Sequence, residues 1–238
     1  MNPDLERIDT YLEKVEKSEY EAMIPQSNGL KVGVDLGTAY IVLVVLDAQN
    51  NPVACEKQAA QVLRDGVVVD YTKALQIVRE LKEKLETRIS HALQNCAIAM
   101  PADTESSVKT HQYVAEGAGF EVTDVLDEPT AANAVYGIRD GVVADIGGGT
   151  TGIAVFRDGK VIHVHDEPTG GTHVSLVLAG HYHMTFEEAE RFKQDDRNHE
   201  EVLSVVHPVL EKMGVIIRRG AGMYHPDAVY LCGGTCCL

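Results

Sequence analysis

Apolar positions near the amino end of the chain recur with the spacing of a helix. Leu5, Ile8, Leu12 and Val15 come at intervals of three or four, with acidic and basic residues between them. This spacing predicts one amphipathic helix, which the turn-forming segment 25–29 (PQSNG) separates from the rest of the chain. We expect the helix to pack on its own protein; docking or dimerisation is the alternative.

From residue 31 the pattern changes to short apolar, β-branched runs between turns, and longer amphipathic segments alternate with them. Strands are predicted at residues 31–35, 39–46, 53–62, 96–100, 121–126, 142–146, 152–156 and 161–165. Helices are predicted at residues 72–94, 105–118, where Gly119 suits the C-cap, and 129–136. Strands alternating with helices predict the α/β class.

One strand-turn-strand pattern occurs twice. Residues 142–147 (VVADIG) repeat the order of residue types in residues 32–37 (VGVDLG), and a new apolar strand begins after each turn. Two related lobes facing a cleft are the simplest architecture for such a duplication. We therefore expect an amino-terminal helix and linker at 1–29, a first lobe at 30–140 and a second lobe at 141–238.

Charge and composition exclude several classes of partner. The chain has 238 residues, of which 21 are Lys or Arg and 36 are Asp or Glu, giving a formal net charge of −15. Nucleic acid needs a basic face, so it is not an expected partner. Apolar runs stay well short of the roughly 20 residues that a membrane span needs. The five cysteines lack the spacing of a disulfide framework, which favours the cytoplasm.

The segment richest in chemistry is residues 145–152 (DIGGGTTG). Consecutive glycines let backbone N–H groups approach an anion, as in phosphate-binding loops. The segment also fits the G-x-G-x-x-G spacing of dinucleotide sites, but a strand rather than a helix comes after it, which argues against a nicotinamide enzyme. A Walker-type loop and the G-x-S-x-G elbow of serine hydrolases are both missing from the sequence.

An aspartate ends the first strand of each copy, at Asp35 and at Asp145. A carboxylate beside a polyphosphate is repelled unless a cation lies between them, and Mg²⁺ suits a site of few carboxylates plus phosphates. Thr38 and Thr150 can add hydroxyl donors. Asp and Gly are also ordinary turn residues, but their recurrence in both copies favours the metal.

Five motifs together resemble those of the actin and DnaK-type ATPase superfamily. In chain order they are residues 34–38 (VDLGT), 127–132 (DEPTAA), 144–150 (ADIGGGT), 189–193 (AERFK) and 230–235 (YLCGGT). They are similar to its first phosphate loop, connecting helix, second phosphate loop, adenosine-holding helix and adenosine motif. Within it the chain is most similar to a chaperone-like family of bacterial ethanolamine-utilisation operons, at residues 62–66 (VLRDG), 125–131, 145–153, 169–180 and 187–190.

The resemblance implies an actin-like (ribonuclease H-like) fold with ATP and Mg²⁺ in a cleft between the lobes. Asp35 and Asp145 would face the Mg²⁺ through water, and Glu128 would act with Asp145 in catalysis by orienting or deprotonating the attacking water. Residues implied to line the phosphates are Gly37, Thr38, Gly147, Gly148, Gly149 and Thr150, and Gly171 is a further implied cofactor-binding residue. Those implied to hold the nucleoside are Glu190, Lys193, Gly233 and Gly234.

The sequence departs from the DnaK pattern in ways that predict weak ATPase activity. Ala39 replaces the second threonine of the first loop, and Ser175 stands where DnaK-type proteins carry aspartate. The segment 53–72 is too short for the subdomain that supplies their catalytic lysine. The chain ends at Leu238, so we also expect the C-terminal helices of the family to be missing.

The resemblance implies a cytoplasmic ATP-binding, chaperone-like protein, associated with a bacterial microcompartment. Its client would be an ethanolamine-utilisation enzyme or shell protein, and nucleotide-dependent closure of the lobes would drive the interaction. The segment 67–71 (VVVDY) resembles bacterial actin MreB, so the alternative is a polymerising homo-oligomer or scaffold with ATP as its assembly switch. Reactivation of a cobalamin-dependent lyase is a further alternative.

Overall fold

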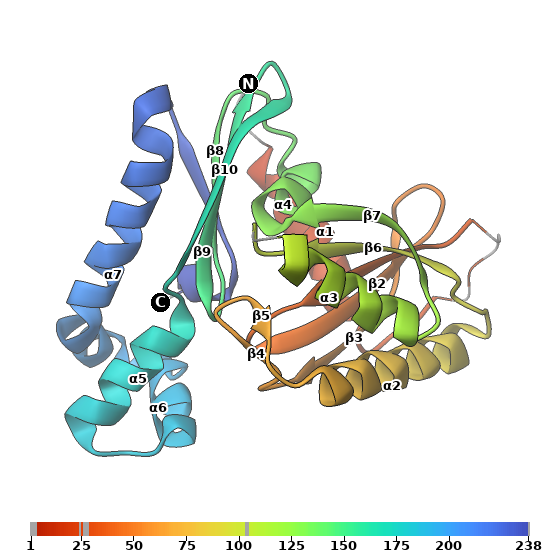
Figure 1. The fold of residues 1–238 in the computed structure, drawn as a ribbon, viewed down its shortest axis with the longest axis horizontal. Coiled ribbons are helices and arrows are strands. Elements are labelled where there is room, and N and C mark those ends of the chain that lie inside the picture. Colours follow the sequence, from red (N-terminus) through yellow and green to blue (C-terminus); the bar gives the residue numbers. More distant parts are fainter. Residues whose placement is uncertain (1–3, 24, 26–28, 103–104, 238) are drawn as a thin grey trace. The chain divides into compact units, whose positions relative to one another are not determined.

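The computed structural model describes residues 4–23, 25, 29–102 and 105–237. Most of the turn segment predicted at 25–29 therefore lies outside the described residues. Contacts divide the chain into two compact units, residues 1–138 and 139–238 (Figure 1).

Unit 1 contains a five-stranded sheet in the order β3-β2-β1-β6-β7. Its strands are β1 (Lys31–Leu36), β2 (Tyr40–Leu46), β3 (Pro52–Ala59), β6 (Asn95–Met100) and β7 (Glu121–Asp127). β2 pairs antiparallel with β1 and β3, whereas β1, β6 and β7 run parallel. The remaining elements are the hairpin β4 (Leu63–Arg64) and β5 (Val67–Val68), and the helices α1 (Leu5–Lys17), α2 (Tyr71–Ile89), α3 (Glu105–Gly117) and α4 (Glu128–Tyr136).

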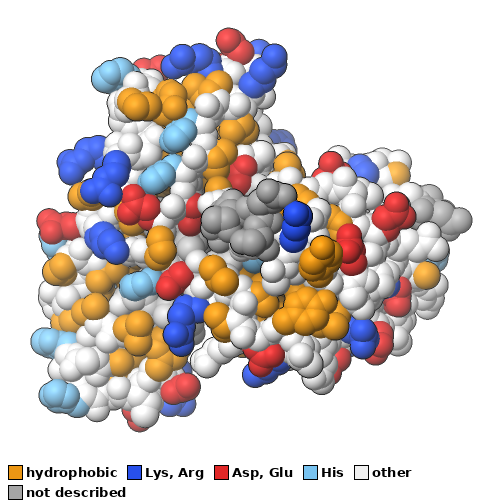
Figure 2. Space-filling view, viewed as in Figure 1, with side chains coloured by type: hydrophobic (Ala, Val, Ile, Leu, Met, Phe, Trp, Pro, Cys, Tyr) orange, Lys and Arg blue, Asp and Glu red, His pale blue; other side chains and the backbone are white. Residues whose placement is uncertain are grey.

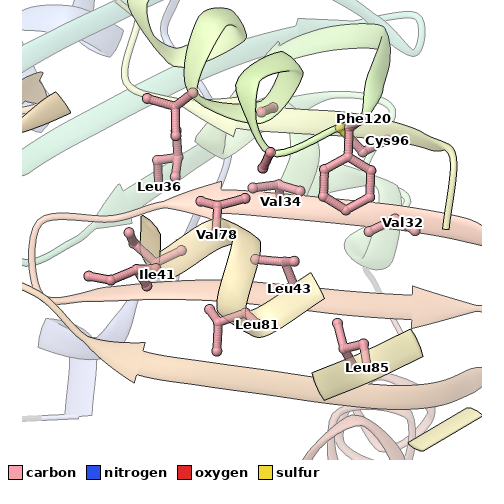
Figure 3. Packing of buried hydrophobic residues seen from close by; sticks show 14 of the residues in the cluster. Val32, Val34, Leu36, Ile41, Leu43, Val78, Leu81, Leu85, Cys96 and Phe120 are labelled. Carbon is pink, nitrogen blue, oxygen red and sulfur yellow. The ribbon is translucent and has the colours of Figure 1, made fainter. Parts of the chain in front are cut away.

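The core of unit 1 lies between α2 and the sheet (Figure 3). Alternate residues of β1 and β2 are buried, as expected for strands with one face on a core. Val78, Leu81 and Leu85 of α2 join Val34 and Leu43 in the same cluster. Truncating a side chain of this kind to alanine typically costs about 2–5 kcal/mol, so this layer holds the first loop in place.

The amino-terminal helix packs on its own unit through one buried position. Ile8 is 2% exposed, whereas Leu5 and Leu12 are 61% and 51% exposed. After the helix, the Ser18 carbonyl accepts hydrogen bonds from the Cys55 N–H of β3 and from an Arg88 N–H of α2. The expected packing is confirmed at Ile8, and half of the predicted apolar stripe faces solvent.

Unit 2 repeats the strand order of unit 1. Its four-stranded sheet has the order β10-β9-β8-β11, in which β8 pairs antiparallel with β9 and parallel with β11. The strands are β8 (Gly141–Ile146), β9 (Thr150–Arg157), β10 (Lys160–Pro168) and β11 (Val229–Cys232), and the helices are α5 (Gly171–Tyr182), α6 (Phe186–Lys193) and α7 (His199–Ala221). β8, β9, β10 and β11 thus correspond in order to β1, β2, β3 and β6, and β7 of unit 1 has no counterpart in the sheet of unit 2.

Two predicted boundaries were wrong. The helix predicted at 72–94 ends at Ile89, because Ser90 takes a left-handed conformation with φ 55°. The strand predicted at 53–62 ends at Ala59, and the hairpin β4–β5 comes next.

None of the helices in the described residues combines the length and apolarity that crossing a membrane requires. Acidic and basic side chains are scattered over the face of the molecule that Figure 2 shows.

Candidate functional site

The first loop of unit 1 comes directly after β1. Asp35 and Thr38 are both partly buried there. Gly37 lies in the tight turn between β1 and β2, where a Cβ atom would come within 2.6 Å of the Tyr40 carbonyl oxygen. Such an approach to backbone leaves no space for a side chain, so the turn requires glycine at this position.

Glu128 is the first residue of α4. The helix is capped by Asp127, whose side chain accepts a 2.8 Å hydrogen bond from the Thr130 N–H, and Pro129 is buried in the first turn. A carboxylate in a first helical turn is stabilised by the helix dipole. Stabilisation by the dipole of α4 is sufficient to explain an acidic residue at position 128. The catalytic role of Glu128 stays a prediction.

The second loop, in unit 2, joins β8 to β9. It closes on itself through a 3.0 Å hydrogen bond from the Gly147 N–H to the Thr150 carbonyl. Within the part of the chain that the structure describes, the backbone N–H groups of Gly148 and Gly149 have no acceptor. Buried backbone donors are nearly always paired, and Gly149 is buried. The loop therefore offers two donors suited to an anion.

The first turn of α5 is fastened to this loop. The Gly147 and Gly148 carbonyls accept hydrogen bonds of 3.0 and 2.8 Å from the N–H groups of Gly171 and Thr172. A Cβ atom on Gly170 would lie 2.5 Å from the Gly147 carbonyl oxygen. Backbone thus packs directly on backbone, and the loop is held rigidly by the residues that precede and open α5.

Asp145, at the end of β8, is partly buried against the adenosine motif. Burial raises the pKa of its carboxyl to about 6. β11 runs parallel beside β8, so Gly233, the residue after Cys232, lies at the same edge of the sheet as Asp145. A Cβ atom on Gly233 would overlap an Asp145 carboxylate oxygen and lie 2.5 Å from the Ile146 carbonyl oxygen. The carboxylate occupies the space that a side chain at 233 would need.

The residues implied to hold the nucleoside form a buried cluster with Ser175 of α5. The Lys193 Nζ lies 2.5 Å from Glu190 Oε1 and 2.9 Å from the Ser175 hydroxyl, which itself lies 2.5 Å from Glu190 Oε1. A Cβ atom on Gly171 would approach both Lys193 Nζ and the Thr235 hydroxyl. Thr235 in turn donates a 2.8 Å hydrogen bond to the Gly147 carbonyl. Direct contacts therefore join this cluster to the second loop.

Unit 2 alone brings most of the sequence-predicted site residues together. They are Asp145, Gly147, Gly148, Gly149, Thr150, Gly171, Glu190, Lys193 and Gly233; Gly234 is the exposed residue next to Gly233. Asp35, Gly37, Thr38 and Glu128 belong to unit 1. Sequence reasoning did not place Ser175 or Thr235 in the site. The position of Thr235 directly after its glycine pair is a signal that could have marked it, whereas the contacts of Ser175 come from the packing of α6 on α5.

These residues fit a nucleotide with a divalent cation. A desolvated carboxylate gains stability from a nearby cation, and the glycine N–H groups suit phosphate oxygens. Among the described residues, groups of three or more His, Cys, Asp or Glu side chains that could hold a metal are absent. A desolvated carboxylate beside a glycine loop is a donor set of the kind that Mg²⁺ uses together with a ligand's own phosphates.

Two comparisons with known proteins establish the fold class. The model of the family "Cell division protein FtsA" matches residues 142–217. The crystal structure of MreB5 of Spiroplasma citri bound to ADP is similar with a TM-score of 0.66 and 18% identity, over 87% of this chain and 85% of that chain. The fold is the actin-like ATPase fold, two α/β units with the same strand order.

Closer relatives identify the family. Ethanolamine utilization protein EutJ of Salmonella typhimurium is 42% identical over 207 residues, which are 87% of this chain and 73% of the relative. The crystal structure of EutJ from Carboxydothermus hydrogenoformans is similar with a TM-score of 0.87 and 47% identity, covering 96% of this chain and 85% of that one. The chain belongs to the EutJ family of ethanolamine utilisation proteins.

The raised pKa of Asp145 predicts a pH-dependent gain of stability in Asp145→Asn. The Asp145 carboxyl loses its proton near pH 4 in the unfolded chain and near pH 6 in the folded chain. The free energy of unfolding of the wild type therefore falls by about 3 kcal/mol as the pH rises from 4 to 6. Without nucleotide and metal, we expect the variant to exceed the wild type by about 1–3 kcal/mol at pH 8 and to match it near pH 4. Urea unfolding measures this difference.

The matched control is Asp196→Asn, at a side chain that is 96% exposed. It should behave like the wild type at both pH values. Equal stability of Asp145→Asn and the wild type at pH 8 would show that the Asp145 carboxylate is not desolvated.

The close packing at Gly233 predicts that Gly233→Ala is strongly destabilising. Its φ is +89°, and the added methyl would overlap the Asp145 carboxylate. We expect a loss of about 2–4 kcal/mol of unfolding free energy, from backbone strain plus overpacking. Gly234→Ala is the control, because an added Cβ there meets nothing within 4 Å. Thermal denaturation compares the two, and similar melting temperatures would contradict the geometry.

Proposed function

We propose that this chain binds ATP with Mg²⁺ and uses the nucleotide to control a protein interaction in ethanolamine utilisation. The observation that carries the proposal is the second loop. There, Gly148 and Gly149 follow the desolvated Asp145 by three and four residues, and the Gly147 carbonyl of the same loop accepts a hydrogen bond from Thr235, which contacts the Glu190 cluster through Gly171. Phosphate donors, a metal-facing carboxylate and a sugar-facing carboxylate in one unit are what a nucleoside triphosphate needs.

In the proposed complex each group has a separate task. Gly148 and Gly149 would donate to phosphate oxygens, and Asp145 and Asp35 would hold the Mg²⁺ through water. The ion supplies charge neutralisation for the phosphates. Glu128 would orient the attacking water or take its proton. Because the short segment 53–72 leaves no place for a DnaK-type catalytic lysine, hydrolysis would be slow, and binding rather than turnover would carry the function.

The chaperone-like action is proposed from family membership. Nucleotide binding would favour a closed arrangement of the two units, and a protein client would distinguish closed from open. An ethanolamine-utilisation enzyme or a shell protein of the microcompartment is the proposed client, met in the cytoplasm. The likeness in fold to MreB5 favours a second candidate, a polymerising protein in which ATP controls assembly of copies of the chain.

Calorimetric titration of ATP, with and without Mg²⁺, tests the proposal on the wild type and Asp145→Ala. We expect Mg²⁺ to tighten ATP binding by the wild type at least about tenfold, since an ion-mediated carboxylate contact contributes roughly 1.5–3 kcal/mol. Asp145→Ala should lose this gain. Equal heats for both proteins would remove the metal role of Asp145.

Light scattering during the same titration separates the two candidates. A rise with protein concentration that requires ATP would favour assembly of copies of the chain. Constant scattering would favour a protein that acts on a client.

A further inference from the structure

Ser175 occupies the centre of the buried cluster in unit 2. Its side chain is fully buried in α5, and its hydroxyl lies 2.5 Å from Glu190 Oε1, 2.9 Å from Lys193 Nζ and 3.2 Å from the Gly171 carbonyl oxygen. A serine hydroxyl has one hydrogen to donate and can accept from other groups. The shortest contact receives the hydrogen, so Ser175 donates to Glu190 and accepts from Lys193.

Lys193 is saturated by protein acceptors. Its ammonium lies within hydrogen-bond distance of Glu190 Oε1, the Ser175 hydroxyl and, at 3.2 Å, the Gly171 carbonyl oxygen. An ammonium has three N–H groups, so each is used, and the side chain is only 11% exposed. A ligand would have to break one of these bonds to reach it. Lys193 therefore supports Glu190 in this arrangement.

Glu190 presents its other oxygen on the exposed side. Both short contacts, from Ser175 and Lys193, fall on Oε1, whereas Oε2 accepts a longer 3.2 Å hydrogen bond from the Gln194 amide. The Glu190 side chain is 27% exposed, more than that of Lys193. A carboxylate oxygen can accept more than one hydrogen bond. With Oε1 anchored, the direction of Oε2 is fixed.

We propose that Ser175 is a positioning residue that orients Glu190 toward a ribose hydroxyl and thereby makes the site prefer ribonucleotides to deoxyribonucleotides. The inference rests on the proposed nucleotide function. An ionised carboxylate only accepts hydrogen bonds and repels phosphate, so its partner in ATP is a donor, either a sugar hydroxyl or the 6-amino group of adenine. We assign Glu190 to a sugar hydroxyl, which the deoxy analogues test. An aspartate at 175 would itself only accept and would compete with Glu190 for Lys193; serine donates instead.

Equilibrium binding of ATP, 2′-deoxy-ATP and 3′-deoxy-ATP, each with Mg²⁺, tests the inference. The wild type should bind ATP about tenfold more tightly than at least one deoxy analogue, as expected for a hydrogen bond to a charged group. In Ser175→Ala this ratio should fall to about twofold, chiefly through weaker ATP binding. Ser204→Ala removes an exposed hydroxyl of α7 that donates to the Glu201 carbonyl, and it should keep the wild-type ratio.

A double-mutant cycle shows whether Ser175 acts through Glu190. In a Glu190→Gln background, Ser175→Ala should change the ratio by less than about twofold, whereas independent effects would add. Should Ser175→Ala fail to fold, Ser175→Cys, with its weaker donor, should give a ratio between those of the wild type and Glu190→Gln.

The outcomes separate the two proposals. A wild type that binds none of the three nucleotides overturns the proposed function. A wild type that binds all three equally, or a folded Ser175 variant that binds ATP with an unchanged ratio, overturns the role of Ser175 and leaves the proposed function standing.

Discussion

A carboxylate buried against glycine backbone is the constraint on which unit 2 depends. Asp145 loses hydration where β8 and β11 end side by side, and its carboxylate fills the space beside Gly233. An ionised group in such a place is costly unless a cation compensates for it. The site thus carries an electrostatic cost in the absence of ligand, and a metal-bound polyphosphate is the kind of ligand that relieves it.

The glycines around this carboxylate are required by the same crowding. A Cβ atom on Gly170 or Gly233 would overlap backbone of the second loop or of Ile146, and a Cβ atom on Gly171 would overlap the Thr235 hydroxyl. In this packing the loop carbonyls accept hydrogen bonds from the first turn of α5, and the N–H groups of Gly148 and Gly149 are available to bind an anion. Rigid support of this kind is what a binding site requires if it is to distinguish ligands.

The sequence predicts much of the fold because the spacing of apolar residues and the residue types at turns depend only on neighbours in the chain. The strands β1 and β2 and the two aspartate-containing turns could be predicted from the order of residue types alone. The sequence patterns assigned no element to α5 or α7: α5 is apolar on nearly every side, without a polar stripe, and α7 carries Pro208 in its interior. The role of Ser175 depends on α6 packing against α5, a tertiary contact that local spacing does not predict.

The central proposal is that the Asp145 carboxylate of unit 2 faces a divalent ion carried by the phosphates of a nucleotide. Crystals grown with Mn²⁺ and a non-hydrolysable ATP analogue test it directly, because anomalous scattering locates manganese independently of the protein. The account predicts a manganese peak about 4 Å from an Asp145 carboxylate oxygen, with water between them. A nucleotide bound with its metal remote from the Asp145 carboxylate would contradict it.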